Sequence, residues 1–121
     1  MLNNSFSQTV TVLENQTAAY VGSGGLSVFS TPSLIALIEN TCMKMLSDLP
    51  EGKTTVGVSI NIQHLKPSPV GATIHCSATI TAIEGRKYTF QVQATDDAGN
   101  LIGTGTHERV VVDTERFMSK V

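Results

Sequence analysis

The segment 31–49 (TPSLIALIENTCMKMLSDL) constrains the fold most, because it is the one long amphipathic helix that the sequence predicts. Its apolar side chains recur with the helical period of about 3.6 residues and fill one continuous arc. Thr31 followed by Pro32 is typical of the beginning of a helix, and the turn at 49–52 marks its end. We therefore expect a single helix with a wide face that must be buried.

The remainder of the chain changes to a period of two residues, which predicts β-strands. A short candidate strand covers 8–13, and alternating strands follow the helix at 55–65, 73–83, 87–95 and 101–112. In the first of these four, the alternation places five side chains on the face that covers the helix: Val56, Val58, Ile60, Ile62 and His64.

One helix followed by consecutive strands indicates an α+β domain with an antiparallel sheet. Each predicted strand has one apolar face, and helix 31–49 is the element large enough to cover it. A curved antiparallel sheet wrapped around one long central helix is the hotdog fold, and we expect one such domain over residues 1–121. Open sheet edges and a charged fraction of only 15% favour a homodimer.

Composition excludes several classes of function. The net charge of −2 argues against a nucleic-acid partner, which usually requires a basic surface. The apolar runs are shorter than the roughly 20 residues of a membrane span, and MLNNSFSQTV has no secretory signal pattern. Cys42 and Cys76 occupy apolar positions without metal-binding spacing, so we expect reduced thiols, no metal site and a cytoplasmic location.

Glu39 is the least expected residue of the helix, because it lies inside the apolar arc between Leu46 and Met43. A carboxylate that faces a core costs several kcal/mol unless it is paired or hydrogen-bonded. Active sites are where such positions are commonly found. An ion pair at a subunit interface explains Glu39 equally well on this observation alone.

His64 ends the strand 55–65 on the face that we expect to look toward Glu39. A histidine on an apolar face is more often an ordinary core residue, but an acid and an imidazole in one covered layer favour a catalytic pair. Thr31 is predicted to be the N-cap of the helix. The beginning of a helix also presents N–H groups to an anion or a developing oxyanion.

The last predicted strand contains two glycines and two polar residues of interest, His107 and Arg109. Gly103 and Gly105 predict a close approach of the backbone by the helix or by a ligand. Arg109 is interpreted as an ion-pair residue or a phosphate partner. The alternation leaves the direction of His107 open, whereas His75 falls on the polar side of its strand and is expected to be solvated.

Three blocks resemble one known family: 28–42 (VFSTPSLIALIENTC), 51–64 (EGKTTVGVSINIQH) and 103–112 (GTGTHERVVV). With their spacing, they are similar to the fluoroacetyl-CoA thioesterase-like group of hotdog proteins. The motifs are Thr-x7-Glu on the helix, Gly-x6-His on the next strand and His-Glu-Arg-Val near the end. The resemblance implies a dimer that hydrolyses a small acyl-CoA thioester to a free acid and CoA, with no cofactor besides the CoA of the substrate.

The resemblance also implies roles for individual residues. Thr31, Glu39 and His64 would be the catalytic set, Gly57 would lie against the substrate or the CoA arm, and Arg109 would bind or brace near the CoA. The fluoroacetyl enzyme carries aromatic residues where this chain has 24–27 (GGLS), so fluoroacetyl-CoA is not the expected substrate.

Alternatives remain open at this point. Glu39 or Thr31 attacks the thioester while His64 activates water for release, or Glu39 and His64 activate water directly. A non-catalytic acyl- or CoA-binding module is a second possible function. A hydratase or dehydratase is a third, although its histidine usually lies near the helix start, where this chain has Thr31.

Overall fold

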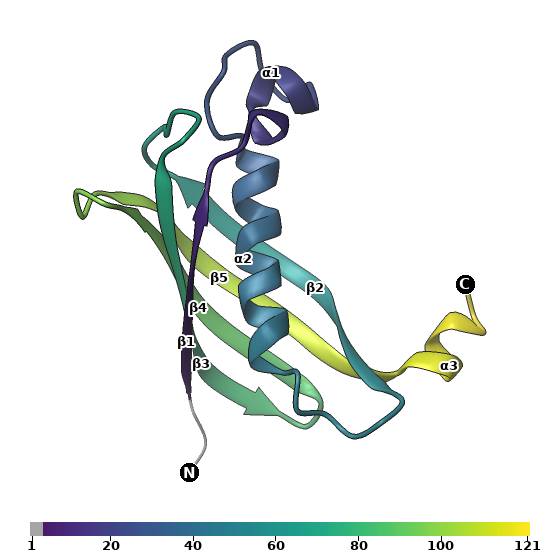
Figure 1. Cartoon of the computed structure of the whole chain (residues 1–121). Coiled ribbons are helices and arrows are strands. Elements are labelled where there is room, and N and C mark those ends of the chain that lie inside the picture. Colours follow the sequence, from purple (N-terminus) through teal and green to yellow (C-terminus); the bar gives the residue numbers. More distant parts are fainter. Residues whose placement is uncertain (1–3) are drawn as a thin grey trace.

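The computed structural model describes residues 4–121 and shows one long helix lying across one face of a curved antiparallel sheet (Figure 1). Residues 1–3 of the predicted domain 1–121 lie outside the described residues. In chain order the elements are β1 (Ser5–Thr11), η1 (Glu14–Gln16), α1 (Ala18–Val21), α2 (Thr31–Met45), β2 (Lys53–His64), β3 (Thr73–Glu84), β4 (Lys87–Asp96), β5 (Leu101–Asp113) and α3 (Thr114–Met118).

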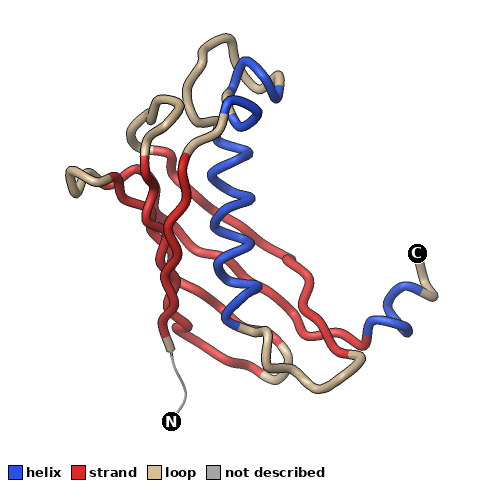
Figure 2. The backbone as a smooth tube through the Cα atoms, viewed as in Figure 1, coloured by secondary structure: helices blue, strands red, loops and turns tan. Residues whose placement is uncertain are grey.

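The sheet has five strands in the order β1-β3-β4-β5-β2, and every neighbouring pair is antiparallel. The first strand and the strand that follows α2 are therefore the two edges of the sheet. Figure 2 shows the long helix along one side of the curved sheet, with several strands crossing behind it and the short helices at the periphery. This arrangement confirms the predicted α+β class with a sheet wrapped around a central helix.

Helix α2 begins at Thr31, as predicted, but its N-cap lies one residue before the predicted cap. Ser30 is the N-cap, because its extended backbone precedes the helix and its hydroxyl accepts a hydrogen bond from the Ser33 N–H. The prediction of Thr31 as the cap is therefore wrong. Thr31 is the first helical residue, and its hydroxyl is free for another contact. The helix ends at Met45 rather than at residue 49.

The core forms where one stripe of α2 meets β3 and β4. Gly103 of β5 lets the helix come close, since a Cβ there would lie 2.8 Å from Cδ2 of Leu34. The predicted close approach at this glycine is confirmed, and its partner is the helix. The buried side chains of this core include Leu34, Ile38, Cys42, Ile74, Cys76, Ala78, Phe90, Val92, Ala94 and Ile102.

A β-bulge changes the phase of β2. The pairing with β5 shifts between Gly57 and Ser59, so two residues of β2 face one residue of its neighbour. The side chains of Ile60 and His64 remain on the helix side, but Val58 is 54% exposed. The predicted inward direction of Val56 and Val58 is wrong, because alternation reverses across the bulge. Gly57 takes the inward position instead.

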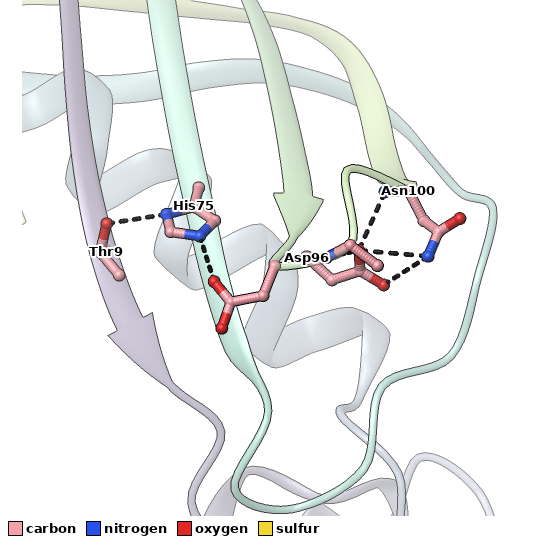
Figure 3. A network of polar contacts seen from close by, with 6 residues as sticks. Thr9, His75, Asp96 and Asn100 are labelled. Carbon is pink, nitrogen blue, oxygen red and sulfur yellow. Dashed lines mark hydrogen bonds and ion pairs between the residues drawn. The ribbon is translucent and has the colours of Figure 1, made fainter.

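The turn between β4 and β5 is held by the Asp96 carboxylate, which accepts hydrogen bonds from the backbone and the side-chain amide of Asn100 (Figure 3). These bonds lower the pKa of Asp96. Beside the turn, His75 lies on the exposed side of β3 between Thr9 and Asp97. The prediction that His75 is solvated is confirmed.

Candidate active site

Thr31 and His64 meet at the N-terminal end of α2. Thr31 is the first residue of the helix and His64 is the last residue of β2, which runs back along the helix. Oγ1 of Thr31 lies 2.8 Å from Nδ1 of His64. With a neutral imidazole, the hydroxyl can donate its proton to Nδ1, which is the first requirement for a hydroxyl nucleophile with an adjacent base.

A cavity of about 310 Å³ lies against this pair. Thr31 itself is exposed, so a ligand in the cavity can reach its hydroxyl. The walls come from α1, from the loop before α2 and from the residues after β2. They are Ala18, Ser23, Val28, Phe29, Ser30, Thr31, Pro32, His64, Leu65, Lys66 and Pro67.

The second nitrogen of His64 is buried and, within residues 4–121, has no hydrogen-bond partner. Burial also lowers the pKa of His64, which favours the neutral imidazole near neutral pH. If Nδ1 accepts the Thr31 proton, Nε2 carries the other proton and requires an acceptor. The imidazole of His64 is therefore placed as a base whose Nε2 needs a further polar partner.

Glu39 lies further along α2, in a second polar cluster. A Cβ added at Gly57 would be 3.0 Å from Oε2 of Glu39, 3.1 Å from Cε1 of His107 and 3.4 Å from Nη1 of Arg109. Only a glycine leaves room for these three side chains to converge. The conformation of β2 at the bulge thus decides what surrounds the acid.

Arg109 is the cation of this cluster and is only 7% exposed. It donates from Nε to the Thr55 hydroxyl at 2.9 Å and from Nη2 to the Thr55 carbonyl at 3.0 Å. His107 Nδ1 donates to the Ser59 carbonyl at 2.8 Å, so its Nε2 is free to accept from Nη1 of Arg109 at 3.2 Å. Burial lowers the pKa of both His107 and Arg109, and the nearby Glu39 charge opposes this.

The structure does not bring Glu39 and His64 together within one chain. Thr31 and Glu39 are eight residues apart, which is about 12 Å along a helix with a rise of about 1.5 Å per residue. His64 lies at the level of Thr31, whereas Glu39 lies at the level of Gly57. The predicted contact of the acid with this imidazole is therefore wrong for a single chain.

Two members of the second cluster are missed by sequence reasoning: His107 and Thr55. The signal for His107 is the alternation of β5, because Gly103, His107 and Arg109 have the same parity and all three are buried. Thr55 is predicted to face away from the helix, but the bulge places it inside with Gly57. Among the described residues, no cluster of three His, Cys, Asp or Glu side chains is suited to a metal ion.

None of the helices within 4–121 has the length and apolarity that a transmembrane helix requires.

The family model described as fluoroacetyl-CoA-specific thioesterase matches residues 12–115. A fluoroacetyl-CoA thioesterase from Streptantibioticus cattleyicolor is 35% identical over 95 residues, covering 78% of this chain and 68% of that protein.

Solved structures agree with this relationship. A phenylalanine-to-alanine variant of the fluoroacetyl-CoA-specific thioesterase superposes with a TM-score of 0.92 at 28% identity, covering 100% of this chain and 94% of that one. The same variant in complex with fluoroacetate and CoA gives a TM-score of 0.89 at 27% identity, covering 97% and 98%. A thioesterase superfamily member from Thermus thermophilus, at 22% identity and a TM-score of 0.88 over 96% and 86%, shares the fold. The chain therefore belongs to the fluoroacetyl-CoA-specific thioesterase family and has the hotdog fold.

Proposed function

We propose that this protein is an acyl-CoA thioesterase, which hydrolyses a small acyl-CoA thioester to a free acid and CoA. The observation that carries the proposal is the hydrogen bond between Thr31 and His64 beside a small cavity, in a chain of a thioesterase family. The CoA moiety enters as part of the substrate, and the chemistry requires no separate cofactor.

In the proposed reaction, His64 Nδ1 takes the proton of the Thr31 hydroxyl as Oγ1 attacks the thioester carbonyl. The tetrahedral intermediate collapses by breaking the C–S bond, and the CoA thiolate leaves with the proton from the imidazolium. This step leaves an acyl ester on Thr31. His64 then takes a proton from water, and the hydroxide releases the acid and restores the threonine.

The oxyanion needs donors that are not already used. At the start of α2, Pro32 has no N–H and the Ser33 N–H is bonded to Ser30. The bulge of β2 is a better source, since a bulge leaves a backbone group outside the ladder of hydrogen bonds. We therefore assign the oxyanion donors to the segment at Gly57 and Val58 of the partner subunit, which reaches the Thr31–His64 pair in the proposed dimer.

The proposed active enzyme is a homodimer formed along β2. This long strand is an edge of the sheet, and an exposed edge is a template for pairing with another chain. In an antiparallel pairing about a two-fold axis, the His64 end of one strand lies beside the Gly57 end of the other. Glu39 of the partner subunit would then supply the acceptor that Nε2 of His64 lacks in a single chain.

The buried, unpaired cysteines Cys42 and Cys76 are consistent with the cytoplasm as the proposed location. The net charge of −2 supports a small-molecule substrate and not a nucleic acid.

The test is a thiol-release assay with a panel of short and medium acyl-CoA thioesters. Release of free CoA supports the thioesterase, and the preferred acyl group identifies the substrate. Binding of acyl-CoA without thiol release would instead support a non-catalytic module. A change in enoyl absorbance without thiol release would support a hydratase.

A further inference from the structure

A second cavity, also of about 310 Å³, lies at the other end of β2 from His64 and is strongly basic. We call it the basic pocket; the residues used below are Lys53, Arg86, Asp113, Arg116, Phe117 and Lys120. Four of the eight Lys and Arg residues of a chain with a net charge of −2 gather here. Figure 1 shows α3 projecting beside the start of β2, which brings these segments together.

Asp113 is the one carboxylate in the lining of the basic pocket, and it already has partners. One of its oxygens accepts the Arg116 N–H as the N-cap of α3, and the other lies 4.0 Å from Nζ of Lys53. Four cations and one carboxylate leave three positive charges, so the pocket attracts an anion with more than one charge.

Phe117 adds an aromatic side chain that is 41% exposed in this charged setting. A planar apolar face among cations is suited to a nucleobase that carries phosphates, because bases stack on aromatic side chains while Lys and Arg bind the phosphate oxygens. A phosphomonoester alone carries about 1.5 to 2 negative charges at neutral pH. The nucleotide end of CoA combines an adenine, a phosphomonoester and a diphosphate.

A third cavity, of about 250 Å³, adjoins the basic pocket between the C-terminal end of α2 and the beginning of β2. It shares Lys53 with the basic pocket and extends to Thr55, the residue that holds Arg109. Its wall also includes Met43, one helical turn after Glu39. The two cavities therefore mark a path along β2 from the cations to the polar cluster.

The length of this path matches the pantetheine arm. From Lys53 to Gly57 is four residues, or about 13 Å at about 3.3 Å per residue. The arm between the diphosphate and the thioester has as many bonds as four to five extended residues, or about 16 Å. His64 of the same chain is eleven residues from Lys53, or about 36 Å, which the arm does not span.

We propose that the basic pocket binds the 3′-phosphoadenosine diphosphate end of CoA and that the arm follows β2 to Glu39. The inference rests on the proposed thioesterase function and on pairing along β2. A thioester delivered in this way lies beside Glu39 and Gly57 of the chain that holds the nucleotide. The Thr31–His64 pair that attacks it belongs to the partner subunit.

The experiment uses the full chain with Arg116→Gln and Lys120→Gln combined, and Phe117→Ala as a second variant. Lys87→Gln is the matched control, because Lys87 pairs with Glu108 and does not line the basic pocket. We expect KM for acyl-CoA to rise about tenfold with kcat within twofold, and KM for the matching acyl-pantetheine to stay unchanged. The control should leave both values unchanged.

A binding readout separates the two proposals. Titration of CoA and dephospho-CoA into the wild-type protein should show tighter binding of CoA, and the double variant should lose that difference. Failure of the wild type to release thiol from any acyl-CoA would overturn the thioesterase but leave this titration interpretable. Unchanged KM and unchanged CoA binding in both variants would overturn the pocket assignment. A strong preference of the wild type for acyl-carrier protein over acyl-CoA, lost in the double variant, would also overturn it, because the pocket would then bind an acidic protein.

Discussion

Thr31 Oγ1 lies 2.8 Å from His64 Nδ1, and this contact exists because Ser30 rather than Thr31 caps helix α2. An N-cap threonine would use its hydroxyl on the helix backbone. Here the serine satisfies that requirement one residue earlier, and the threonine hydroxyl points to an imidazole at the mouth of a cavity. Ser30 thus has the structural role of the N-cap, and the adjacent Thr31 is left for the proposed chemical role.

This separation predicts different effects for substitutions at the two positions. Thr31→Ala removes the proposed nucleophile, so kcat should fall by about 10²- to 10⁴-fold while thermal unfolding remains close to wild type. Thr31→Ser keeps a hydroxyl and should retain much more activity than the alanine variant. Ser30→Ala is the matched control, with a loss of about 1 kcal/mol in stability and little loss of kcat at temperatures where it is folded. Equal kcat for Thr31→Ala and the wild type would remove Thr31 from the mechanism.

A shared site predicts complementation between inactive variants. Glu39→Gln and Thr31→Ala should each be nearly inactive as homodimers. In a mixed dimer, one site combines the intact Thr31–His64 pair of the first chain with the intact Glu39 of the second. Random subunit exchange should restore about a quarter of the wild-type thiol release, since about half of the dimers are mixed and each has one complete site.

The control for this mixture is the double variant Thr31→Ala with Glu39→Gln, mixed with the wild type. A mixed dimer of this kind contains a complete site only if Thr31, His64 and Glu39 of the same chain act together. If the site is shared between subunits, both sites of the mixed dimer are incomplete. Thiol release that does not rise when the two single variants are mixed, although exchange is confirmed by mass spectrometry, would exclude the shared site.

Gly57→Ala should damage the polar cluster. Its Cβ would meet the Glu39 carboxylate and the His107 ring at 3.0 and 3.1 Å, so these side chains must move. We expect a loss of about 1 to 3 kcal/mol in stability and at least a tenfold loss of kcat/KM. Gly25→Ala is the matched control, because a Cβ at Gly25 meets no atom within 4 Å. A Gly57→Ala enzyme with wild-type kcat/KM would show that the position of Glu39 is unimportant.

The stability of the fold should depend on pH through His107. Burial lowers the pKa of His107 below the ordinary value of 6.5, so below pH 6.5 the unfolded chain binds more protons than the folded chain. The free energy of unfolding should therefore fall as the pH drops below 6.5. His107→Asn retains an N–H donor for the Ser59 carbonyl but does not titrate, and it should flatten this dependence. Urea unfolding between about pH 5 and pH 8 measures both slopes, and identical slopes would contradict the prediction.

The two thiols should be unreactive in the folded protein. Cys42 and Cys76 are fully buried, and burial raises the pKa of Cys42 to about 12. Because the thiolate is the reactive form, a disulfide reagent at pH 8 should label neither cysteine until the chain unfolds. Labelling in a time course with and without urea tests this. Rapid labelling of the native protein would show that the core opens.

Local patterns were sufficient for the elements of this fold. The helical period of 31–49 and the alternation of the later strands predict one helix on an antiparallel sheet, because each element must bury one apolar face. Glu39 and His64 stood out for the same reason, as polar side chains at positions where the periodicity expects apolar ones. The family motifs predict Thr31, Gly57 and Arg109 as further residues of the site.

The sequence by itself determined the type and order of the elements and marked most of the polar residues on the covered faces. Only the tertiary structure decided which of those residues meet. The bulge at Val58 reversed the phase of β2 and brought Gly57 and Thr55 inward, and the cap at Ser30 released Thr31 for His64. Neither event changes the periodicity of the sequence, since a bulge depends on pairing with β5 and a shift of one residue at a cap is below what a pattern resolves.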